Sequence, residues 1–166
     1  GILASLDWNS NKWQDLPTSE DLKNSKFSYV VEHKVSFTAL NFAQDLYSPI
    51  EGDNYYGLVP HLWSKTLDKE KSKYVKAVFF KSHNWEDNKT YIVGLYAFQK
   101  FDKRKIPSPI ASLRMEFDAN ICALPKNICL LSEFINLNNH PDLKRFLPVG
   151  KELGKMGFNY LTKENV

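Results

Sequence analysis

The chain has 166 residues, 43% of them hydrophobic, and 22 Lys+Arg against 19 Asp+Glu give it a net charge of +3. A chain of about 150 residues buries roughly 70% of its unfolded surface, so one compact domain forms without disulfides or a metal. The composition excludes a mostly disordered chain, no apolar run reaches the roughly 20 residues of a membrane helix, and the charge permits a nucleic-acid partner without requiring one.

The residues expected to be strands are rich in β-branched and aromatic side chains and are bounded by turn formers. In chain order they are 2–6, 27–40, 55–59, 74–82, 90–98, 112–117 and 128–135. The segments 74–82 and 90–98 carry the strongest pattern and should pair as a hairpin with a seven-residue loop. The alternation of Val35, Phe37 and Ala39 with polar residues favours a strand with one solvated face over 27–40.

Helical signals are fewer. Thr18 or Ser19 can cap a helical turn, residues 61–76 are a charge-rich exposed helix or loop, and 141–156 is the best helix candidate, although Pro148 and Gly150 shorten or break it. Many short strands with two or three helical inserts indicate an α+β fold built on a bent sheet or small barrel. We expect one domain over residues 1–166.

Several kinds of catalytic or metal site lack their sequence pattern. Neither a G-x-S-x-G nucleophile nor a Gly-rich phosphate loop occurs, and the four His are far apart without a zinc spacing. A metal-dependent nuclease remains an alternative because Glu32 and Lys34 lie two apart in an expected strand, with Asp21 upstream. The same acid-x-Lys spacing recurs three more times, so it is uninformative. Cys122 and Cys129 are expected to be buried thiols of a cytoplasmic protein.

Aromatic residues make up 14% of the chain, more than a core of this size usually takes. Trp within loops of Asn, Asp and Ser is hard to explain by packing alone. A flipped base needs aromatic faces for stacking and a polar side chain that reads its edge. The residues expected to bind such a base are Trp8, Asn9, Trp13, Tyr55, Tyr56, Asn84 and Trp85.

Basic side chains would hold the phosphates and set the register of a bound nucleic acid. The residues expected in this role are Lys12, Lys81, Lys100, Lys103, Arg104 and Lys105, with Lys144 and Arg145 as further candidates. A solvated hairpin edge explains the run over 100–105 equally well.

The order of several short motifs resembles a known family. The motifs are an apolar strand leading into W-N-x-x-x-W at 8–13, L-N-F at 40–42, YYGLV at 55–59, VFFKS at 78–82, YIVGLYAF at 91–98 and GFNYL at 157–161. Together they are similar to the EVE and YTH-like branch of the PUA-like superfamily, and most similar to modules at the N-terminus of McrB-type, modification-dependent restriction GTPases. The initiator Met is missing, since both Met are internal, which favours an excised N-terminal module of a larger protein.

The resemblance implies a pseudo-barrel of five to six strands with flanking helices and an aromatic cage that takes a modified base, such as N6-methyladenine or 5-methylcytosine. It implies a module without catalytic activity, metal or cofactor of its own, which directs a separate motor and nuclease subunit to modified double-stranded DNA in the cytoplasm. The alternatives are an RNA-binding relative that reads methylated or single-stranded RNA, the metal-dependent nuclease, and a protein-interaction domain.

Overall fold

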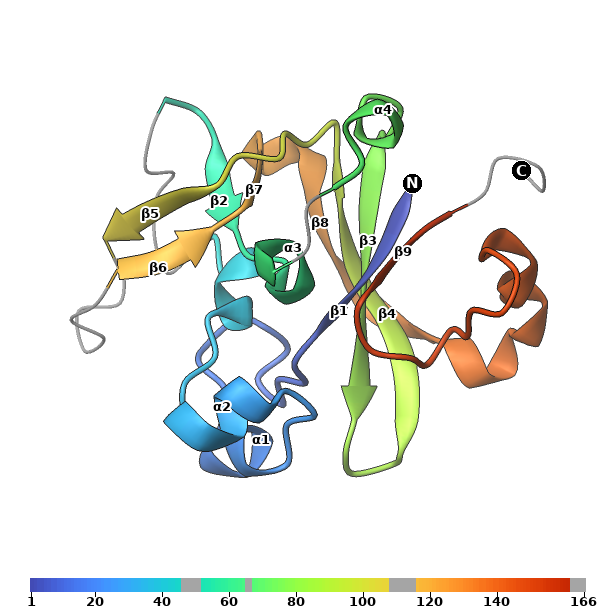
Figure 1. The fold of residues 1–166 in the computed structure, drawn as a ribbon. Coiled ribbons are helices and arrows are strands. Elements are labelled where there is room, and N and C mark those ends of the chain that lie inside the picture. Colours follow the sequence, from blue (N-terminus) through green and yellow to red (C-terminus); the bar gives the residue numbers. More distant parts are fainter. Residues whose placement is uncertain (46–51, 65–66, 108–115, 162–166) are drawn as a thin grey trace.

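A computed structural model describes residues 1–45, 52–64, 67–107 and 116–161. Within them the fold is α+β, with a five-stranded sheet, two two-stranded sheets and short helices (Figure 1). The class expected from the sequence is therefore confirmed at this level. In Figure 1 the five-stranded sheet runs through the middle of the molecule, with the small sheets and α1, α2 and α3 on its left and the segment between β8 and β9 on its right.

The large sheet has the strand order β8-β4-β3-β1-β9. Its strands are β1 (Ile2–Leu6), β3 (Ala77–Asn84), β4 (Lys89–Ala97), β8 (Ile128–Asn136) and β9 (Phe158–Tyr160). β1 pairs with β3 in parallel and with β9 in antiparallel orientation, and the remaining pairs are antiparallel. β1 is buried at all five positions, which explains why all its residues except Ser5 are apolar.

A close approach in this sheet requires glycine. A Cβ atom at Gly94 on β4 would lie 2.4 Å from the backbone oxygen of Cys129 and 2.6 Å from the ring of Phe42. Because real Cβ atoms do not approach so closely, only Gly lets the ring of Phe42 pack on the sheet beside Phe80 and Tyr96.

The two small sheets contain the four remaining strands of the described residues. β2 (Tyr55–Gly57) pairs with β7 (Ile121–Ala123), and β5 (Arg104–Pro107) pairs with β6 (Glu116–Ala119), both antiparallel. A second buried cluster, with Phe37, Leu40, Tyr56 and Ile106 among its members, lies between them.

The helices are short. They are α1 (Ser19–Lys23), α2 (Ser28–His33), η1 (Thr38–Asn41), α3 (Pro60–Ser64), α4 (Lys69–Ser72), η2 (Pro125–Asn127), η3 (Leu137–Asn139) and η4 (Pro141–Phe146). Thr18 caps α1 as expected: its side chain accepts from Asp21 N, and the Asp21 carboxylate accepts from Thr18 N.

The structure confirms the strands at 2–6, 90–98 and 128–135 and the hairpin of β3 and β4, although its connection is shorter than expected. A strand over 27–40 is wrong. α2 occupies this segment, Lys34 adopts a left-handed conformation with φ 55° and ends the helix, and η1 follows. The alternation at 35–39 therefore belongs to a turn segment whose polar side chains bond to each other and to Asp7.

Three further expectations need correction. The helix expected over 141–156 is the single short segment η4, since Pro148 and Gly150 follow it as turn residues. Cys129 is exposed, whereas Cys122 is buried as expected. The strand expected at 112–117 corresponds to β6 only from residue 116, and its first part lies outside the described residues.

A candidate ligand pocket

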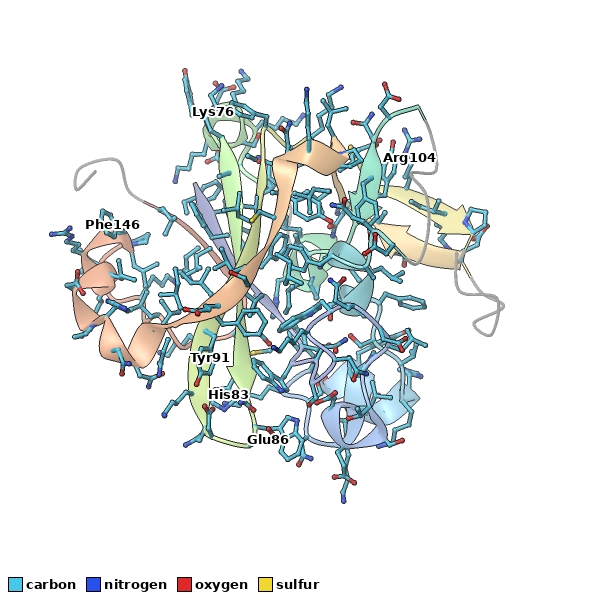
Figure 2. The ribbon with its side chains drawn as sticks, turned by 180° about the vertical axis from the view of Figure 1, so that it is seen from behind. Lys76, His83, Glu86, Tyr91, Arg104 and Phe146 are labelled. Carbon is cyan, nitrogen blue, oxygen red and sulfur yellow. The ribbon has the colours of Figure 1, made fainter. Side chains whose placement is uncertain are left out.

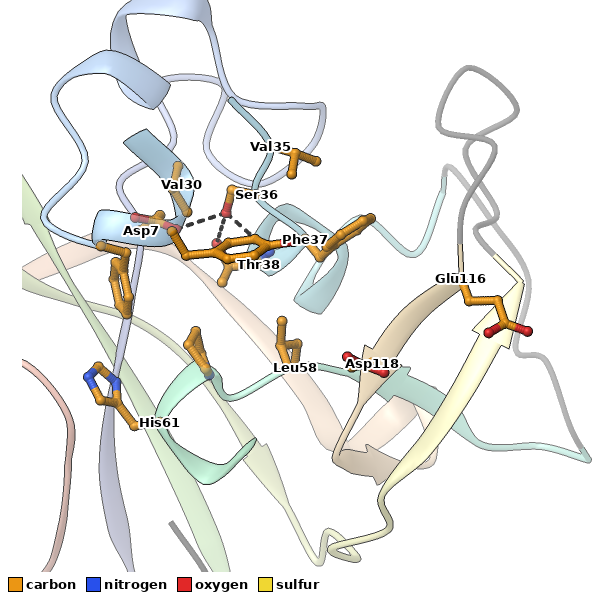
Figure 3. Close-up of a pocket in the computed structure, with 13 residues that line it drawn as sticks. Asp7, Val30, Val35, Ser36, Phe37, Thr38, Leu58, His61, Glu116 and Asp118 are labelled. Carbon is orange, nitrogen blue, oxygen red and sulfur yellow. Dashed lines mark hydrogen bonds between the residues drawn. The ribbon is translucent and has the colours of Figure 1, made fainter. Parts of the chain in front are cut away.

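A pocket of about 520 Å³ opens beside the carboxyl end of β1, between α2 and η1 on one side and β6 on the other (Figure 3). Its lining residues are Asp7, Phe27, Tyr29, Val30, Val35, Ser36, Phe37, Thr38, Leu58, Pro60, His61, Glu116 and Asp118. The volume falls in the range of roughly 300–1,000 Å³ that is typical of small-molecule sites.

The end of α2 shapes the pocket. The left-handed conformation of Lys34 lets its N–H donate to Val30 O at 2.8 Å and reverses the chain. After the reversal, Phe37 and the partly buried Val35 pack in the second cluster beneath β2. Apolar side chains of this cluster thus form part of the pocket wall.

Asp7 supplies the buried charge of the pocket. Its carboxylate accepts a hydrogen bond from Ser36 Oγ at 2.9 Å and another from Ser25 Oγ. Burial raises the pKa of Asp7 to about 6; the two serine hydroxyls oppose this rise, and the Asp21 charge adds to it. Near neutral pH the group is therefore a buried carboxylate, and it attracts a ligand that carries N–H donors.

Hydroxyl groups extend this polar edge. Ser36 Oγ lies 2.9 Å from Thr38 Oγ1, so a chain of polar atoms runs from the carboxylate of Asp7 along one wall (Figure 3). A hydroxyl can donate or accept, which lets this wall adapt to the edge of a planar heterocycle.

Aromatic rings also line the pocket. Phe27 packs on His61 with ring centroids 5.3 Å apart, and Tyr29 packs on His33 at 4.4 Å. Phe27, Tyr29 and His61 all line the pocket. Tyr29 remains 51% exposed, so a ring face is available to a ligand at the mouth of the pocket.

Two carboxylates lie at the β6 side, away from Asp7 (Figure 3). Glu116 is exposed and Asp118 is half-buried, and Asp118 stands opposite Lys105 in the register of β5 and β6. Together with Asp7 they make the pocket acidic. This charge disfavours a phosphate inside the pocket and favours a neutral or cationic planar group with N–H donors.

The structure places the predicted base-binding residues elsewhere. All seven lie in the described part of the chain, and none is among the residues that line the pocket. Trp13 is 0% exposed, and Trp8 is half-buried against it with ring centroids 5.7 Å apart. Phe134 packs edge-on against both rings, so the two Trp belong to the core and offer no open cage.

The tyrosine pair at 55–56 is also part of the core. Tyr55 is buried and its hydroxyl donates to Leu40 O, while Tyr56 is buried in the second cluster with the guanidinium of Arg104 5.1 Å from its ring centroid. These rings have no free face for a base, and their placement corrects the expectation that they form a pocket wall.

The remaining predicted base contacts hold loops in place. Asn9 donates to Asp15 O at 2.9 Å and accepts from Asn11 N at 2.8 Å. Asn84 accepts from Glu86 N at the tip of the hairpin, and Trp85 Nε1 donates to the carboxylate of Asp21 at 3.0 Å. The polar neighbours of the Trp residues thus serve turn geometry.

The predicted phosphate contacts divide into two groups. Lys81 is buried, and its ammonium donates to the backbone oxygens of Leu153 and Lys155. Arg104 pairs with Asp102 at 2.7 Å and lies over Tyr56. These two are structural contacts, whereas the exposed residues are Lys12, Lys100, Lys103 and Lys105, together with Lys144 and Arg145.

The pocket residues of α2 and η1 were missed because an expected strand over 27–40 distributes Phe27, Tyr29 and Phe37 along a sheet. One signal was present. Asp7 follows a strand that is apolar except for Ser5, and a carboxylate at such a position either pairs with donors or serves a site.

Comparisons of the chain with models of protein families, with curated proteins and with solved structures find no match. Within residues 1–45, 52–64, 67–107 and 116–161, no helix has the length and apolar character to cross a membrane. The same residues contain no group of three or more His, Cys, Asp or Glu placed to hold a metal ion. Glu32, the residue of the nuclease alternative, lies on the exposed side of α2 and not on a strand.

Proposed function

We propose that this domain binds nucleic acid that carries a modified base, most specifically modified double-stranded DNA, by taking one flipped base into the pocket beside Asp7. The observation that carries the proposal is the pocket itself, which combines aromatic rings with a buried carboxylate and hydroxyls. Enzymes and readers that act on a base extrude it from the duplex into such a pocket.

The size of the pocket supports this assignment. About 520 Å³ leaves room for a base together with part of its sugar. Stacking on an aromatic ring contributes about 1–3 kcal/mol, which offsets part of the few kcal/mol needed for unstacking.

The charge of the pocket limits which bases fit. Asp7 accepts hydrogen bonds, and adenine, cytosine and guanine carry an exocyclic amino group that donates, whereas thymine and uracil carry only exocyclic oxygens. A methyl group on the base contributes roughly 0.8 kcal/mol when it is buried among apolar atoms such as those of Val30 and Val35. The pocket therefore disfavours thymine and uracil, and among the other bases we propose a methylated adenine or cytosine, as the family resemblance implies.

The resemblance to PUA-like EVE and YTH modules, noted from the sequence, agrees with this function. The bent arrangement of one large and two small sheets is compatible with a PUA-like pseudo-barrel. In a McrB-type protein the domain would direct a GTPase motor and a nuclease subunit to modified DNA. This role as a targeting module is part of the proposal.

The test measures binding of the domain to matched duplexes with no modification, N6-methyladenine, 5-methylcytosine or 5-hydroxymethylcytosine, with a methylated RNA as competitor. A preference of about tenfold or more for one modified DNA, about 1.4 kcal/mol, supports the proposal. Equal binding of all four duplexes contradicts it, and retention of the RNA competitor over DNA would assign the pocket to RNA.

Variants locate the preference in the pocket. Phe27→Ala and Tyr29→Ala should abolish the preference for the modified duplex. Ile135→Ala truncates an exposed apolar side chain of β8 outside the pocket and should leave the preference unchanged. If the two pocket variants discriminate as well as the unmodified domain does, the base enters elsewhere.

A further inference from the structure

A second surface, at the end of the hairpin where β3 begins and β4 ends, combines exposed aromatic rings with lysines. Tyr74 is 77% exposed and Phe98 is 72% exposed. Phe98 N donates to Lys76 O at 2.8 Å, and the side chain of Gln99 donates to Val75 O at 3.2 Å. The segments 74–76 and 98–100 are therefore joined side by side.

Neither packing nor local conformation explains the ring of Phe98. Its φ is 50°, in the left-handed region that favours Gly and Asn. A Phe at this position therefore costs backbone free energy, and its exposed ring returns little burial. The exposed ring of Phe98 is therefore accessible to a ligand.

The charge of this surface is strongly positive. Its exposed lysines are Lys69, Lys71, Lys73, Lys76 and Lys100, and the two carboxylates on the same segments are Asp68 and Glu70. We call these lysines together with Tyr74 and Phe98 the strand-end platform. Its charge excess equals the net charge of +3 of the whole chain.

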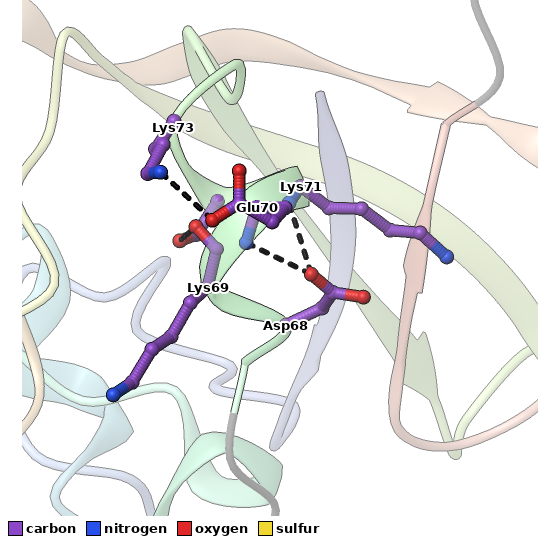
Figure 4. Close-up of polar contacts among 6 residues, drawn as sticks. Asp68, Lys69, Glu70, Lys71 and Lys73 are labelled. Atoms are coloured by element: carbon purple, nitrogen blue, oxygen red, sulfur yellow. Dashed lines mark hydrogen bonds and ion pairs between the residues drawn. The ribbon is translucent and has the colours of Figure 1, made fainter.

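The carboxylates of α4 are engaged locally. Asp68 caps α4 by accepting from Glu70 N and Lys71 N, and Glu70 pairs with Lys73 at 2.8 Å (Figure 4). The ammonium of Lys71 lies 5.6 Å from the ring centroid of Tyr160 on β9, on the side of α4 away from Lys73 (Figure 4). Lysine charge thus continues from α4 toward the edge of the large sheet.

We propose that the strand-end platform binds a single-stranded nucleic acid, with unpaired bases stacked on Tyr74 and Phe98 and the phosphates held by lysines of α4 and of the two joined segments. Exposed rings within a basic surface are the combination by which proteins hold single strands without reading their sequence. Paired bases hide their faces, so the two rings favour a single strand over a duplex.

The platform and the pocket are separate. β1 and β3 run in parallel, with Ile2 opposite Val78 and Leu6 opposite Ser82. Asp7 follows the Leu6 end, whereas Tyr74 and Lys76 precede the Val78 end. In Figure 2, Lys76 and Glu86 mark the two ends of the hairpin. The proposal for the platform therefore holds or fails independently of the pocket.

The test measures binding of a fluorescent, unmodified oligothymidine to the whole domain over a series of salt concentrations. Tyr74→Ala and Phe98→Gly should each weaken binding about tenfold. Lys76→Gln and Lys100→Gln should each reduce the slope of log affinity against log salt by about 0.7. Val149→Ala and Lys151→Gln, exposed changes outside the platform, are the matched controls and should leave both quantities unchanged.

Phe98→Gly separates binding from folding. Glycine relieves the left-handed backbone, so this variant should unfold at the same or a higher urea concentration while it loses affinity. Unchanged affinity in Tyr74→Ala and Phe98→Gly overturns the proposal. Binding of phosphatidylserine vesicles that depends on both rings, without binding of the oligonucleotide, also overturns it and assigns the surface to a membrane.

Discussion

Two aromatic regions of this domain differ in what covers them. Trp8 and Trp13 pack edge-on with Phe134 beneath the large sheet, whereas Phe27 and Tyr29 lie on short helical segments around a pocket. Both regions mix rings with Asn, Ser and Asp in the sequence. In the first region the polar residues tie a loop together, and in the second they face the pocket. The difference teaches that the type of a loop aromatic does not tell whether its ring face is open.

The largest loss of stability is expected on truncation of Trp13, which represents the covered aromatic region. Trp13→Ala removes a fully buried ring and leaves a cavity, so the free energy of unfolding should fall by about 3–5 kcal/mol. Urea unfolding followed by circular dichroism measures this loss. A loss below about 1 kcal/mol would contradict the placement of Trp13 in the core.

A pH series tests the buried carboxylate of the pocket. The pKa of Asp7 is raised to about 6 in the folded state, so between about pH 4 and 6 the unfolded chain has lost a proton that the folded chain keeps. The contribution of Asp7 to stability therefore falls as pH rises through this window, by roughly 3 kcal/mol. Asp7→Asn should flatten that part of the curve, and an unchanged slope would argue that Asp7 is solvated.

Lys81 provides a test away from both aromatic regions. Lys81→Met leaves the backbone oxygens of Leu153 and Lys155 without their buried donor and should cost about 2 kcal/mol. Hydrogen exchange should show faster opening of residues 153–157 than of β3 and β4. Equal protection of these residues in both proteins would show that the ammonium does not hold this segment.

The smallest effect on stability is expected at the mouth of the pocket. Tyr29→Ala removes a ring that is half exposed, so the free energy of unfolding should change by no more than about 0.5 kcal/mol. Its effect falls on recognition of the modified base. A stability loss as large as that of Trp13→Ala would make Tyr29 a core residue and remove the contrast between the two regions.

The sequence predicts the parts of the fold whose signals are local. The buried run over 2–6, the hairpin and the Thr18 cap each follow from neighbouring residues. The site depends on long-range relations that a local pattern does not contain. Ser36 bonds to Asp7 across 29 positions, and Asp118 comes to the pocket on a separate hairpin. The alternation over 35–39 imitates a strand because Val35 and Phe37 pack in the second cluster, whereas Ser36 bonds to Asp7 and Thr38.

The pairing of β1 also bears on the order of folding. β1 lies between β3 and β9, and Leu161 N donates to Gly1 O at 2.9 Å. Of the strands of this sheet β1 is therefore synthesised first, yet it completes its pairing only after residue 160 has been made. The β3–β4 hairpin can form from local contacts before residue 160 has been made. Until then β1 is an apolar segment without both of its neighbouring strands, and it joins the sheet late. Because closing so long a loop is slow, the refolding rate of this domain should be limited by β1 joining the sheet.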